Sequence, residues 1–474
     1  MNYQKALDYL DDKASLGSVP GLLSVSELCN RLGNPQDELT FVHVAGTNGK
    51  GSTTAFISSI LHAAHVKCAV YTSPAVYDYR ERFVYDGKKI SKELFASLLE
   101  QVADQSEEMV REGLPHPTVF EMETALFLLF AKQKKAELCI LEAGMGGRLD
   151  ATNLISNTRL CVFASISMDH MQFLGNTLAQ IAHNKAGIIK KGASVVTCRQ
   201  ADCVMEELRS EYKAVNVKEL SEPFAAGGVN ALQSDFIVAD SRNAENIRLT
   251  ATGLCFDYSP SNHGTKLKKL KSMLLGLYQV DNAALAIEAA RTLSKMGYGI
   301  SDDAIRTGIL EAKWPGRFEI IPGKPVFILD GAHNEDAAVR LAETIDEYMR
   351  IKNQKAGSDG NLSGGNLILI MGVLADKEYE KVVRILAPRA SMIFTLTPPS
   401  VRALPAYELA KAVSQVNPNV SQTGSCEEAI ELSKLMAQPG DIILACGSLS
   451  FLGKLRLLLA GDREKCKKEK MSSK

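Results

Sequence analysis

The chain has 474 residues, 46% of them hydrophobic, which is enough to bury a large core and to form two or three domains. Lys and Arg total 54 against 55 Asp and Glu, so no net charge attracts nucleic acid or an anionic membrane, and we expect neither as a partner. A start unlike a signal peptide, no apolar run of about 20 residues, and ten scattered cysteines without CxxC spacing favour a cytoplasmic protein with reduced thiols.

Short apolar runs that alternate with helical patterns predict the first domain. Thr40–Val44, Leu138–Leu141 and Leu160–Ile166 are interpreted as buried strands, each followed by a glycine-rich or polar turn. Such alternation favours a mostly parallel sheet covered by helices on both faces. The stretch from about 216 to 275, which includes Phe236–Ala239 and Leu249–Phe256, is broken by Asn, Gly and Ser and predicts a small antiparallel addition.

A second series of strands predicts a second domain. A helix over Asp281–Lys295 precedes it, and the buried strands are expected at Val326–Leu329, Leu367–Met371, Met392–Leu396 and Ile442–Ala445. We therefore expect an α/β fold with two domains. Residues 1–312 would form a P-loop-type nucleotide-binding domain, and residues 317–474 a Rossmann-like α/β domain.

A glycine-rich loop joins the first strand to a helical pattern and reads Ala45-Gly46-Thr47-Asn48-Gly49-Lys50-Gly51-Ser52. Its glycines let backbone N–H groups approach phosphate oxygens, and the helix directs the positive end of its dipole at them. Lys50 adds charge, and the Ser52 hydroxyl can hold Mg²⁺. Val44 and Gly51 depart from a strict Walker A pattern, and a glycine turn without a ligand is the alternative.

Polar residues follow the neighbouring strands. Glu142 ends one strand and Asp169-His170 follow another, so these residues and Ser52 can offer oxygen and imidazole ligands to Mg²⁺ beyond the strand ends. Taken singly, Glu142 is equally well explained as a surface or capping carboxylate, and His170 is better explained as a hydrogen-bonded loop histidine than as a ligand; their shared location with the phosphate loop favours the metal site. Lys185 lies in a helical pattern, where the residue alone indicates a solvated lysine.

A second glycine-rich loop begins after Glu142 and reads Ala143-Gly144-Met145-Gly146-Gly147-Arg148-Leu149-Asp150-Ala151-Thr152-Asn153. A plain strand-to-helix turn needs far less glycine than this. We therefore interpret the loop as a wall of a substrate site, with opposite charges from Arg148 and Asp150.

Taken together, the motifs resemble those of the folylpolyglutamate synthase/dihydrofolate synthase family, relatives of the Mur ligases. The similarity runs from about residue 9 to residue 453, and its motifs are Leu32-Gly-Asn-Pro-Gln, His43-Val-Ala-Gly-Thr-Asn-Gly-Lys-Gly-Ser, Thr72-Ser-Pro, Leu141-Glu-Ala-Gly-Met-Gly-Gly-Arg-Leu-Asp-Ala-Thr-Asn, Asp169-His, Lys185-Ala-Gly, Gln279-Val-Asp-Asn-Ala, Gly316-Arg-Phe-Glu, Leu329-Asp-Gly-Ala-His-Asn and Gly447-Ser-Leu. Several of them are long, and they occur in the order typical of this family.

The resemblance implies an ATP-dependent ligase that adds L-glutamate to folates, and also to 7,8-dihydropteroate, through an acyl phosphate. It implies ATP and Mg²⁺ as cofactors, with a monovalent cation such as K⁺ as a further candidate, and a monomeric protein. A muropeptide ligase shares this chemistry and is one alternative. A noncatalytic nucleotide switch, which needs only the phosphate loop, is the other.

The resemblance also implies roles for individual residues. The implied magnesium ligands are Ser52, Ser73, Glu142, His170 and, if carbamylated, Lys185. The implied ATP contacts, which come from both domains, are Gly46, Thr47, Asn48, Gly49, Lys50, Gly51, Ser52, Asn282, Arg317, Asp330 and His333. The implied folate contacts are Phe120, Glu121, Arg148, Leu149, Asp150 and Ala151, although Phe120 is as well explained as ordinary core.

Lys50, His170, Lys185 and His333 are the expected catalytic residues. Because His333 and Ser448 follow strands of the second domain, we expect them to place glutamate near the activated acid. The sequence departs from the family pattern at Asn184, where Glu is common, and at Ala75, where His is common.

Overall fold

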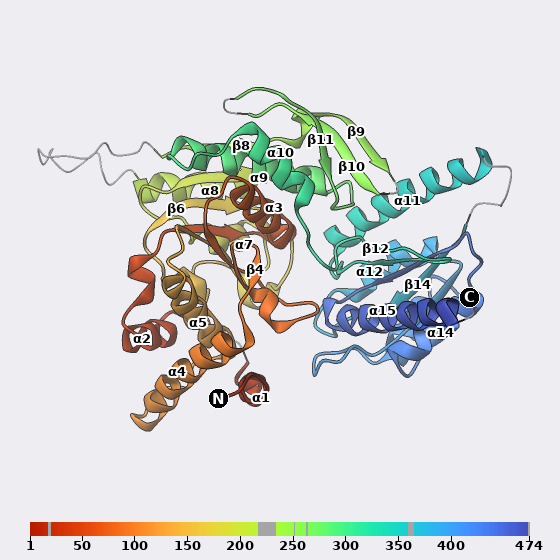
Figure 1. The fold of residues 1–474 in the computed structure, drawn as a ribbon, viewed down its shortest axis with the longest axis horizontal. Helices are drawn as coiled ribbons and strands as arrows, with labels where there is room; N and C mark the ends of the chain where they lie inside the picture. The colour runs from red at the N-terminus through yellow and green to blue at the C-terminus, as the bar shows by residue number, and fades with distance from the viewer. Residues whose placement is uncertain (18–19, 217–233, 251, 262–263, 359–364, 473–474) are drawn as a thin grey trace, which may run out of the picture. The chain divides into compact units, whose positions relative to one another are not determined.

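The computed structural model describes residues 1–17, 20–216, 234–250, 252–261, 264–358 and 365–472, without the side chains of 355–358 and 462–472. It divides into two compact units (Figure 1). The first comprises Met1–Ile247, Phe256–Lys271 and Gln279–Lys313, and the second comprises Arg248–Cys255, Ser272–Tyr278 and Trp314–Lys474. Within the described ranges, no helix has the length and apolar character needed to cross a lipid bilayer.

The first unit is built on an eight-stranded sheet with the order β4-β3-β2-β5-β1-β6-β7-β8. Its strands are β1 (Phe41–Ala45), β2 (Cys68–Tyr71), β3 (Phe83–Tyr85), β4 (Lys88–Lys89), β5 (Leu138–Glu142), β6 (Thr158–Phe163), β7 (Ser194–Cys198) and β8 (Phe236–Ala239). Neighbours from β2 to β8 pair in parallel, whereas β3 and β4 form an antiparallel edge. The predicted mostly parallel sheet is confirmed.

Helices connect these strands and bury the sheet. They are α1 (Tyr3–Lys13), α2 (Leu23–Arg31), α3 (Lys50–Ala63), α4 (Lys92–Arg111), α5 (Val119–Gln133), α6 (Met171–Leu174), α7 (Leu178–Ala186), α8 (Asp202–Asn216), α9 (Gln279–Lys295) and α10 (Asp302–Glu311). Local signals set their starts: the Ser91 hydroxyl accepts the Leu94 N–H at the start of α4, and Thr118 and Glu121 form a capping box at the start of α5.

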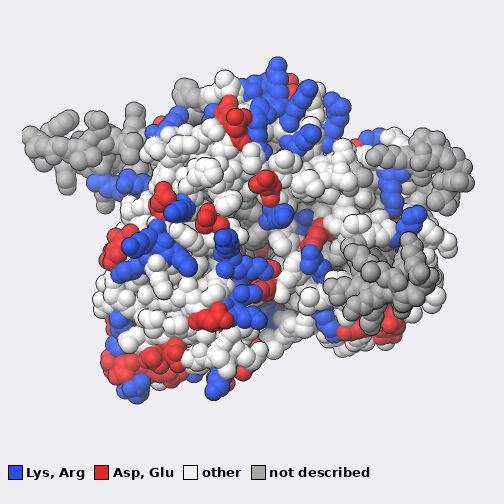
Figure 2. Space-filling view, viewed as in Figure 1, with Lys and Arg blue, Asp and Glu red and all other residues white. Residues whose placement is uncertain are grey.

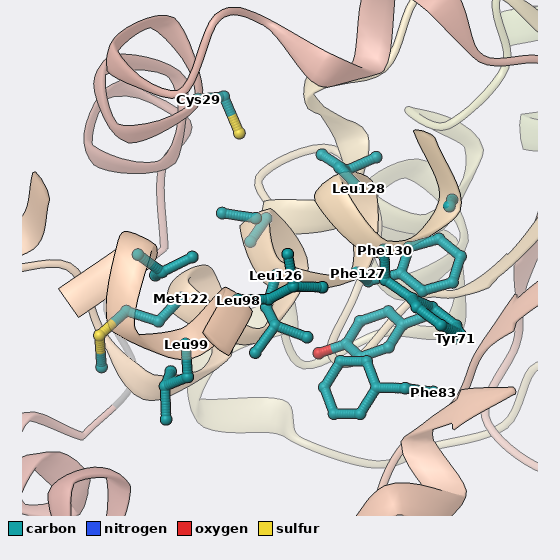
Figure 3. Close-up of a cluster of buried hydrophobic side chains, with 14 of the residues drawn as sticks. Cys29, Tyr71, Phe83, Leu98, Leu99, Met122, Leu126, Phe127, Leu128 and Phe130 are labelled. Carbon is teal, nitrogen blue, oxygen red and sulfur yellow. The ribbon is translucent and has the colours of Figure 1, made fainter. Parts of the chain in front are cut away.

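A large core cluster lies where α2, α4 and α5 pack on one face of the sheet (Figure 3). Apolar side chains of α4 and α5 meet aromatic side chains of β2 and β3, among them Tyr71 and Phe83, whose ring centroids are 5.6 Å apart. Burying side chains of this size contributes roughly 1.5–3 kcal/mol each. This packing fixes the strands whose ends carry the predicted site.

A three-stranded sheet follows, with the order β11-β10-β9, and its strands are β9 (Ala244–Thr250), β10 (Gly253–Tyr258) and β11 (Leu267–Ser272). It confirms the predicted small antiparallel addition. The placement of Phe236–Ala239 in that addition was wrong, because this strand, β8, pairs in parallel with β7 at the edge of the large sheet. Its side chains alternate between half-buried and buried, as expected for an edge strand, and this pattern resembles an antiparallel strand in sequence.

The second unit contains a six-stranded sheet with the order β12-β13-β17-β14-β15-β16. Its strands are β12 (Glu319–Ile321), β13 (Val326–Leu329), β14 (Leu367–Met371), β15 (Met392–Thr395), β16 (Val420–Gln422) and β17 (Ile442–Cys446), and its helices are α11 (Glu335–Ser358), α12 (Tyr379–Leu386), α13 (Ala406–Ser414), α14 (Cys426–Met436) and α15 (Leu449–Ser472). All pairs are parallel except β12 with β13. The predicted second α/β fold is confirmed.

Acidic and basic side chains are interspersed over most of the face shown in Figure 2. Basic side chains gather over the three-stranded sheet, where β11 exposes Lys268, Lys269 and Lys271. This distribution agrees with a formal net charge of −1.

Candidate active site

The phosphate loop runs from the end of β1 to the start of α3. The Thr47 and Asn48 N–H groups donate to the Ser165 carbonyl oxygen, at 2.7 and 3.1 Å, which fixes the loop to the chain that follows β6. Gly49 has φ +86°, and a Cβ atom placed there would collide with Asn282 Oδ1. Only glycine therefore fits at this position.

The loop is built to hold an anion. Gly49 is the N-cap of α3 and makes no side-chain hydrogen bond to the first turn, so the backbone N–H groups there can point at a ligand. Lys50 Nζ folds over the loop and donates to the carbonyl oxygens of Gly46 at 3.1 Å and Thr47 at 3.3 Å. The cation and the dipole of α3 thus act at one place.

Helix α9 lies beside this loop. Gln279 Nε2 donates to the buried Ser52 Oγ at 3.3 Å, and Asn282 Nδ2 donates to Gln279 Oε1 at 2.9 Å. The structure therefore brings Asn282, a predicted ATP contact, against the phosphate loop. Gln279 was not predicted as a site residue, and the only signal for it was its place at the start of the Gln279-Val-Asp-Asn-Ala motif.

The strand order places the other predicted magnesium ligands at neighbouring strand ends. Ser73 follows β2, Glu142 ends β5, and His170 follows β6, while β1 lies between β5 and β6. Glu142 pairs in register with Val44 and is 4% exposed. These polar groups therefore lie along one edge of the sheet, where ligands of parallel sheets bind.

This donor set suits Mg²⁺, which prefers hard oxygen ligands and a site that also holds phosphate. The hydroxyls of Ser52 and Ser73 and the carboxylate of Glu142 supply oxygen ligands, and the glycine loop supplies N–H groups for phosphate. No group of three or more His, Cys, Asp and Glu side chains in the described part of the chain has the arrangement of a metal site. The predicted set contains only two side chains of these types, Glu142 and His170.

Lys185 is buried, at 4% exposure, and its Nζ donates to the Gly46 carbonyl oxygen at 2.8 Å. The interpretation of a solvated helix lysine, drawn from the residue alone, was wrong, because α7 packs its last turn against the phosphate loop. Burial, together with the nearby charge of Lys50, lowers the pKa of Lys185 to about 7, against the opposing effects of Asp169 and Asp150. A neutral amine is therefore accessible at ordinary pH.

The second glycine loop closes around Asp150. Its Oδ2 accepts the Met145 N–H at 2.8 Å, and its Oδ1 accepts the N–H and the hydroxyl of Thr152. Burial raises the pKa of Asp150, although these hydrogen bonds act in the opposite direction. A Cβ atom at Gly147 would lie 2.7 Å from the Lys185 carbonyl oxygen, so glycine is also needed here for the close approach of the loop to α7.

The residues predicted to contact folate differ in their hydrogen bonds, ion pairs and exposure. Arg148 pairs with Glu211 of α8, Nη2 to Oε1 2.9 Å, and the Glu121 carboxylate accepts both the N–H and the hydroxyl of Thr118. Leu149 is 51% exposed, whereas Ala151 is buried.

Phe120 is half-buried against the Tyr71 ring, 5.9 Å between centroids, and packs on Gly144, where a Cβ atom would lie 2.6 Å from its ring. Leu149 and Phe120 are thus the two predicted contacts that combine an apolar side chain with access to solvent.

The predicted residues of the second unit lie at one edge of its sheet. The buried Asp330 carboxylate accepts the Tyr278 hydroxyl at 3.0 Å and the N–H groups of Phe318 and Ala332, each at 2.8 Å. Burial raises the pKa of Asp330, and the Arg317 charge opposes this shift. Arg317 Nη1 lies so close to Gly331 that any Cβ atom there would clash.

His333 and Ser448 also lie at this edge, because β13 and β17 are adjacent. His333 Nδ1 donates to the Gly331 carbonyl oxygen at 2.8 Å, which fixes the orientation of the ring. Ser448 is buried, and its Oγ lies 2.8 Å from Ser450 Oγ at the start of α15. Both residues therefore follow neighbouring strands at the same edge of this sheet.

A surface hollow of about 690 Å³ lies beyond the ends of β7 and β8, lined by charged residues that include Arg199, Asp202, Arg209 and Asp240. It contains none of the predicted site residues, and Asp240 pairs there with Arg199, Nη1 to Oδ2 3.6 Å. We therefore assign the candidate site to the phosphate loop and its neighbouring strand ends.

Comparisons with known proteins agree with this geometry. Residues 44–290 match the family description "Mur ligase middle domain", and residues 316–449 match "Mur ligase, glutamate ligase domain". The chain is 33% identical over 458 residues to dihydrofolate synthase/folylpolyglutamate synthase of Bacillus subtilis, covering 96% of this chain and 98% of the relative.

Solved structures show the same relationship. The folylpolyglutamate synthase of Mycobacterium tuberculosis complexed with ADP aligns with a TM-score of 0.82 and 25% identity, covering 97% of this chain and 99% of that one. The Escherichia coli protein FolC in complex with DHPP and ADP aligns with a TM-score of 0.77 and 26% identity, covering 98% and 99% of the two chains.

Fold and site together define an ATP-dependent ligase of the Mur ligase superfamily. Within that superfamily, the chain belongs to the folylpolyglutamate synthase/dihydrofolate synthase family. The resemblance seen in the motifs is thereby confirmed, and the alternatives of a muropeptide ligase and a noncatalytic switch lose their support.

Proposed function

We propose that this enzyme joins the amine of L-glutamate to the carboxylate of a folate, and also to that of 7,8-dihydropteroate, with ATP and Mg²⁺. The observation that carries the proposal is the phosphate loop with Glu142, Lys185 and the strand ends of Ser73 and His170 around it. Two comparisons support both acids as substrates. One relative carries both activities in its name, and one related structure is a complex with DHPP and ADP.

The chemistry begins with activation, because a carboxylate is a poor acylating agent. Its oxygen attacks the γ-phosphorus of ATP, the bond to the β-phosphate bridging oxygen breaks, and an acyl phosphate and ADP result. Lys50 and the N–H groups at the start of α3 stabilise the charge on the phosphate oxygens during transfer. The residues implied to contact ATP, from Gly46 to Ser52 together with Asn282, Arg317, Asp330 and His333, are proposed to bind it.

The glutamate amine then attacks the acyl carbon. The tetrahedral intermediate collapses to the amide, the C–O bond to phosphate breaks, and the amine loses a proton. We assign His333 and Ser448 to the placement of glutamate. His333→Ala and Ser448→Ala are expected to raise the KM for glutamate about tenfold or more, and an unchanged KM and kcat would refute the assignment.

Ser52, Ser73, Glu142 and His170 are the residues proposed to hold Mg²⁺. The ion would neutralise negative charge on the ATP phosphates. Lys185, with its lowered pKa, is proposed to become carbamylated, which would convert its amine into a further oxygen ligand. Phe120 and Leu149 are proposed to contact the folate through their apolar side chains.

The test is ADP release by the purified protein with Mg-ATP and L-glutamate, with 7,8-dihydropteroate or tetrahydrofolate as the acid. Turnover with both acids is expected. Turnover with tetrahydrofolate alone would limit the activity to polyglutamylation, and turnover with neither would refute the proposal. Omission of glutamate is the control for simple ATP hydrolysis.

A reducing compartment suits this chain. The described cysteines are free, and burial raises the pKa of several, for example Cys29 and Cys68, to about 12. We therefore propose that the enzyme acts in the cytoplasm.

A further inference from the structure

The segment that carries Ser73 folds back onto one carboxylate. Glu81 lies in a short 3-10 helix, Tyr79–Arg82, between β2 and β3. Its Oε2 accepts the backbone N–H groups of Val76 at 3.0 Å and Tyr77 at 3.1 Å. Hydrogen bonds to a charged acceptor are about twice as strong as neutral ones, so the Glu81 carboxylate stabilises the bend that follows Ser73.

The other end of the segment is fastened to the same 3-10 helix. The Thr72 N–H donates to the Arg82 carbonyl oxygen at 3.2 Å, and the Thr72 hydroxyl donates to the Glu81 carbonyl oxygen at 3.4 Å. Lys89 Nζ lies 3.4 Å from Glu81 Oε1, so the second carboxylate oxygen has a cationic partner. Residues 73–77 therefore form a closed loop whose two ends meet at Glu81.

We propose that Glu81 is a positioning residue that fixes Ser73 for magnesium binding. A neutral hydroxyl is a weak ligand that contributes when the fold holds it in place, and the hydrogen bonds of Glu81 provide that support. Without the carboxylate, the Val76 and Tyr77 N–H groups lose their acceptor and the loop gains freedom. The inference rests on the proposed role of Ser73 as a magnesium ligand.

The first test needs no ligand. Residue-resolved hydrogen exchange of the full chain without Mg²⁺ or nucleotide is expected to show protected Val76 and Tyr77 amides, with exchange about tenfold faster in Glu81→Ala. Glu81→Gln keeps an acceptor oxygen and is expected to retain most of the protection. Equal exchange in the wild type and Glu81→Ala would overturn the inference.

The second test asks whether Glu81 acts through Ser73. Mg²⁺ is titrated into the ligation assay, and Mg-ADP binding is measured by calorimetry, for the wild type, Glu81→Ala, Ser73→Ala and the double variant. Each single variant is expected to raise the Mg²⁺ concentration for half-maximal rate about tenfold, and the double variant no further than Ser73→Ala alone. If Glu81→Ala does not fold, Glu81→Asp, whose carboxylate is one methylene too short, takes its place.

Asp78→Asn is the matched control, because the Asp78 side chain contacts Arg80 and Lys89 rather than Val76 and Tyr77, and asparagine keeps the Oδ1 acceptor that caps the 3-10 helix. Its Mg²⁺ dependence is expected to equal that of the wild type. Additive effects in the double variant would overturn the positioning role while leaving Ser73 as a ligand. A normal Mg²⁺ dependence in Ser73→Ala would instead refute the metal role of Ser73, and the inference with it.

Discussion

At the scale of single residues, two glycines with similar positive φ angles separate the demands of the fold from those of the site. Gly49 has φ +86° and Gly192 has φ +76°, but a Cβ atom would collide with Asn282 only at Gly49, whereas nothing lies within 4 Å at Gly192. We expect Gly192→Ala to lower the stability by about 1 kcal/mol and to leave the activity unchanged.

Gly49→Ala is expected to lower the stability by a similar amount and also to displace Asn282 from the phosphate loop. Mg-ADP binding is therefore expected to weaken about tenfold or more. Calorimetric binding and urea unfolding of both variants test this expectation. Equal ADP affinity in the two variants would show that the loop tolerates a Cβ atom.

The lowered pKa of Lys185 predicts a pH dependence. A neutral amine is needed for reaction with CO₂, and with a folded pKa of about 7 the neutral form is lost as the pH falls below that value. The ligation rate is therefore expected to fall below about pH 7, and Lys185→Arg, which stays charged, is expected to lose about 100-fold in kcat.

Carbon-13 NMR of the protein in labelled bicarbonate provides an independent measurement, with a carbamate signal expected in the wild type and absent in Lys185→Arg. Lys191→Arg, at an exposed neighbouring position, is the control. A flat rate profile from about pH 6 to pH 8 without a labelled carbamate would exclude the modification.

The sequence motifs were a good guide to which residues lie around the phosphate loop. They were a poorer guide to the contacts that each side chain makes there. Glycine spacing predicted the loop, because close backbone approach leaves a mark in the sequence. The contact of Asp150 with Thr152 is local, because the two residues are two positions apart at the start of a short 3-10 helix. The buried position of Lys185, by contrast, depends on how α7 packs against the phosphate loop, and such a contact between distant segments leaves no local pattern. The ion pair of Arg148 with Glu211 is of the same kind.

At the scale of elements, α5 is tied to the chain around Ser73 by one buried carboxylate. Glu123, whose side chain is 2% exposed, accepts hydrogen bonds from Tyr71, Tyr79 and Arg82. Removing one member of such a buried pair leaves the other charge uncompensated.

Glu123→Ala is therefore expected to cost about 3–5 kcal/mol of unfolding free energy in urea titrations. Glu108→Ala, which removes an exposed pair with Arg111 on α4, is the control and should cost about 0.5 kcal/mol or less. Similar small effects in the two variants would show that the Glu123 cluster does not hold α5 in place.

Strand β8 shows why one element was misplaced from sequence. Its alternating burial is that of any strand with one covered face, and whether such a strand joins a parallel or an antiparallel neighbour is decided by the chain that connects them. The buried strands β1, β5, β14 and β17 were predicted within one or two residues, because continuous apolar runs with glycine or polar ends are specific to the centre of a parallel sheet.

At the scale of the whole molecule, the two parallel sheets explain why distant motifs carry related chemistry. Parallel strands end at the same edge, so the residues after β2, β5, β1 and β6 meet even though they are far apart in the sequence. The same reasoning groups Asp330 and Ser448 in the second unit.

The eight-stranded sheet also has two edge strands, and one of them is short and charged. Strand β4, at the outer position of the eight-stranded sheet, consists of Lys88 and Lys89, both exposed. Unpaired N–H and C=O groups on such a strand invite pairing with another chain, which leads to aggregation, and lysines oppose this by repelling a second copy.

Replacing both with valine is expected to produce light-scattering aggregates at concentrations where the wild type stays clear, whereas the same change at Lys5 and Lys213, on helices, is not. Clear solutions of the Lys88→Val, Lys89→Val variant would show that another feature prevents aggregation through this edge strand. On this view, two exposed lysines at one edge allow the enzyme to be concentrated in a cell without its largest sheet growing from one molecule into the next.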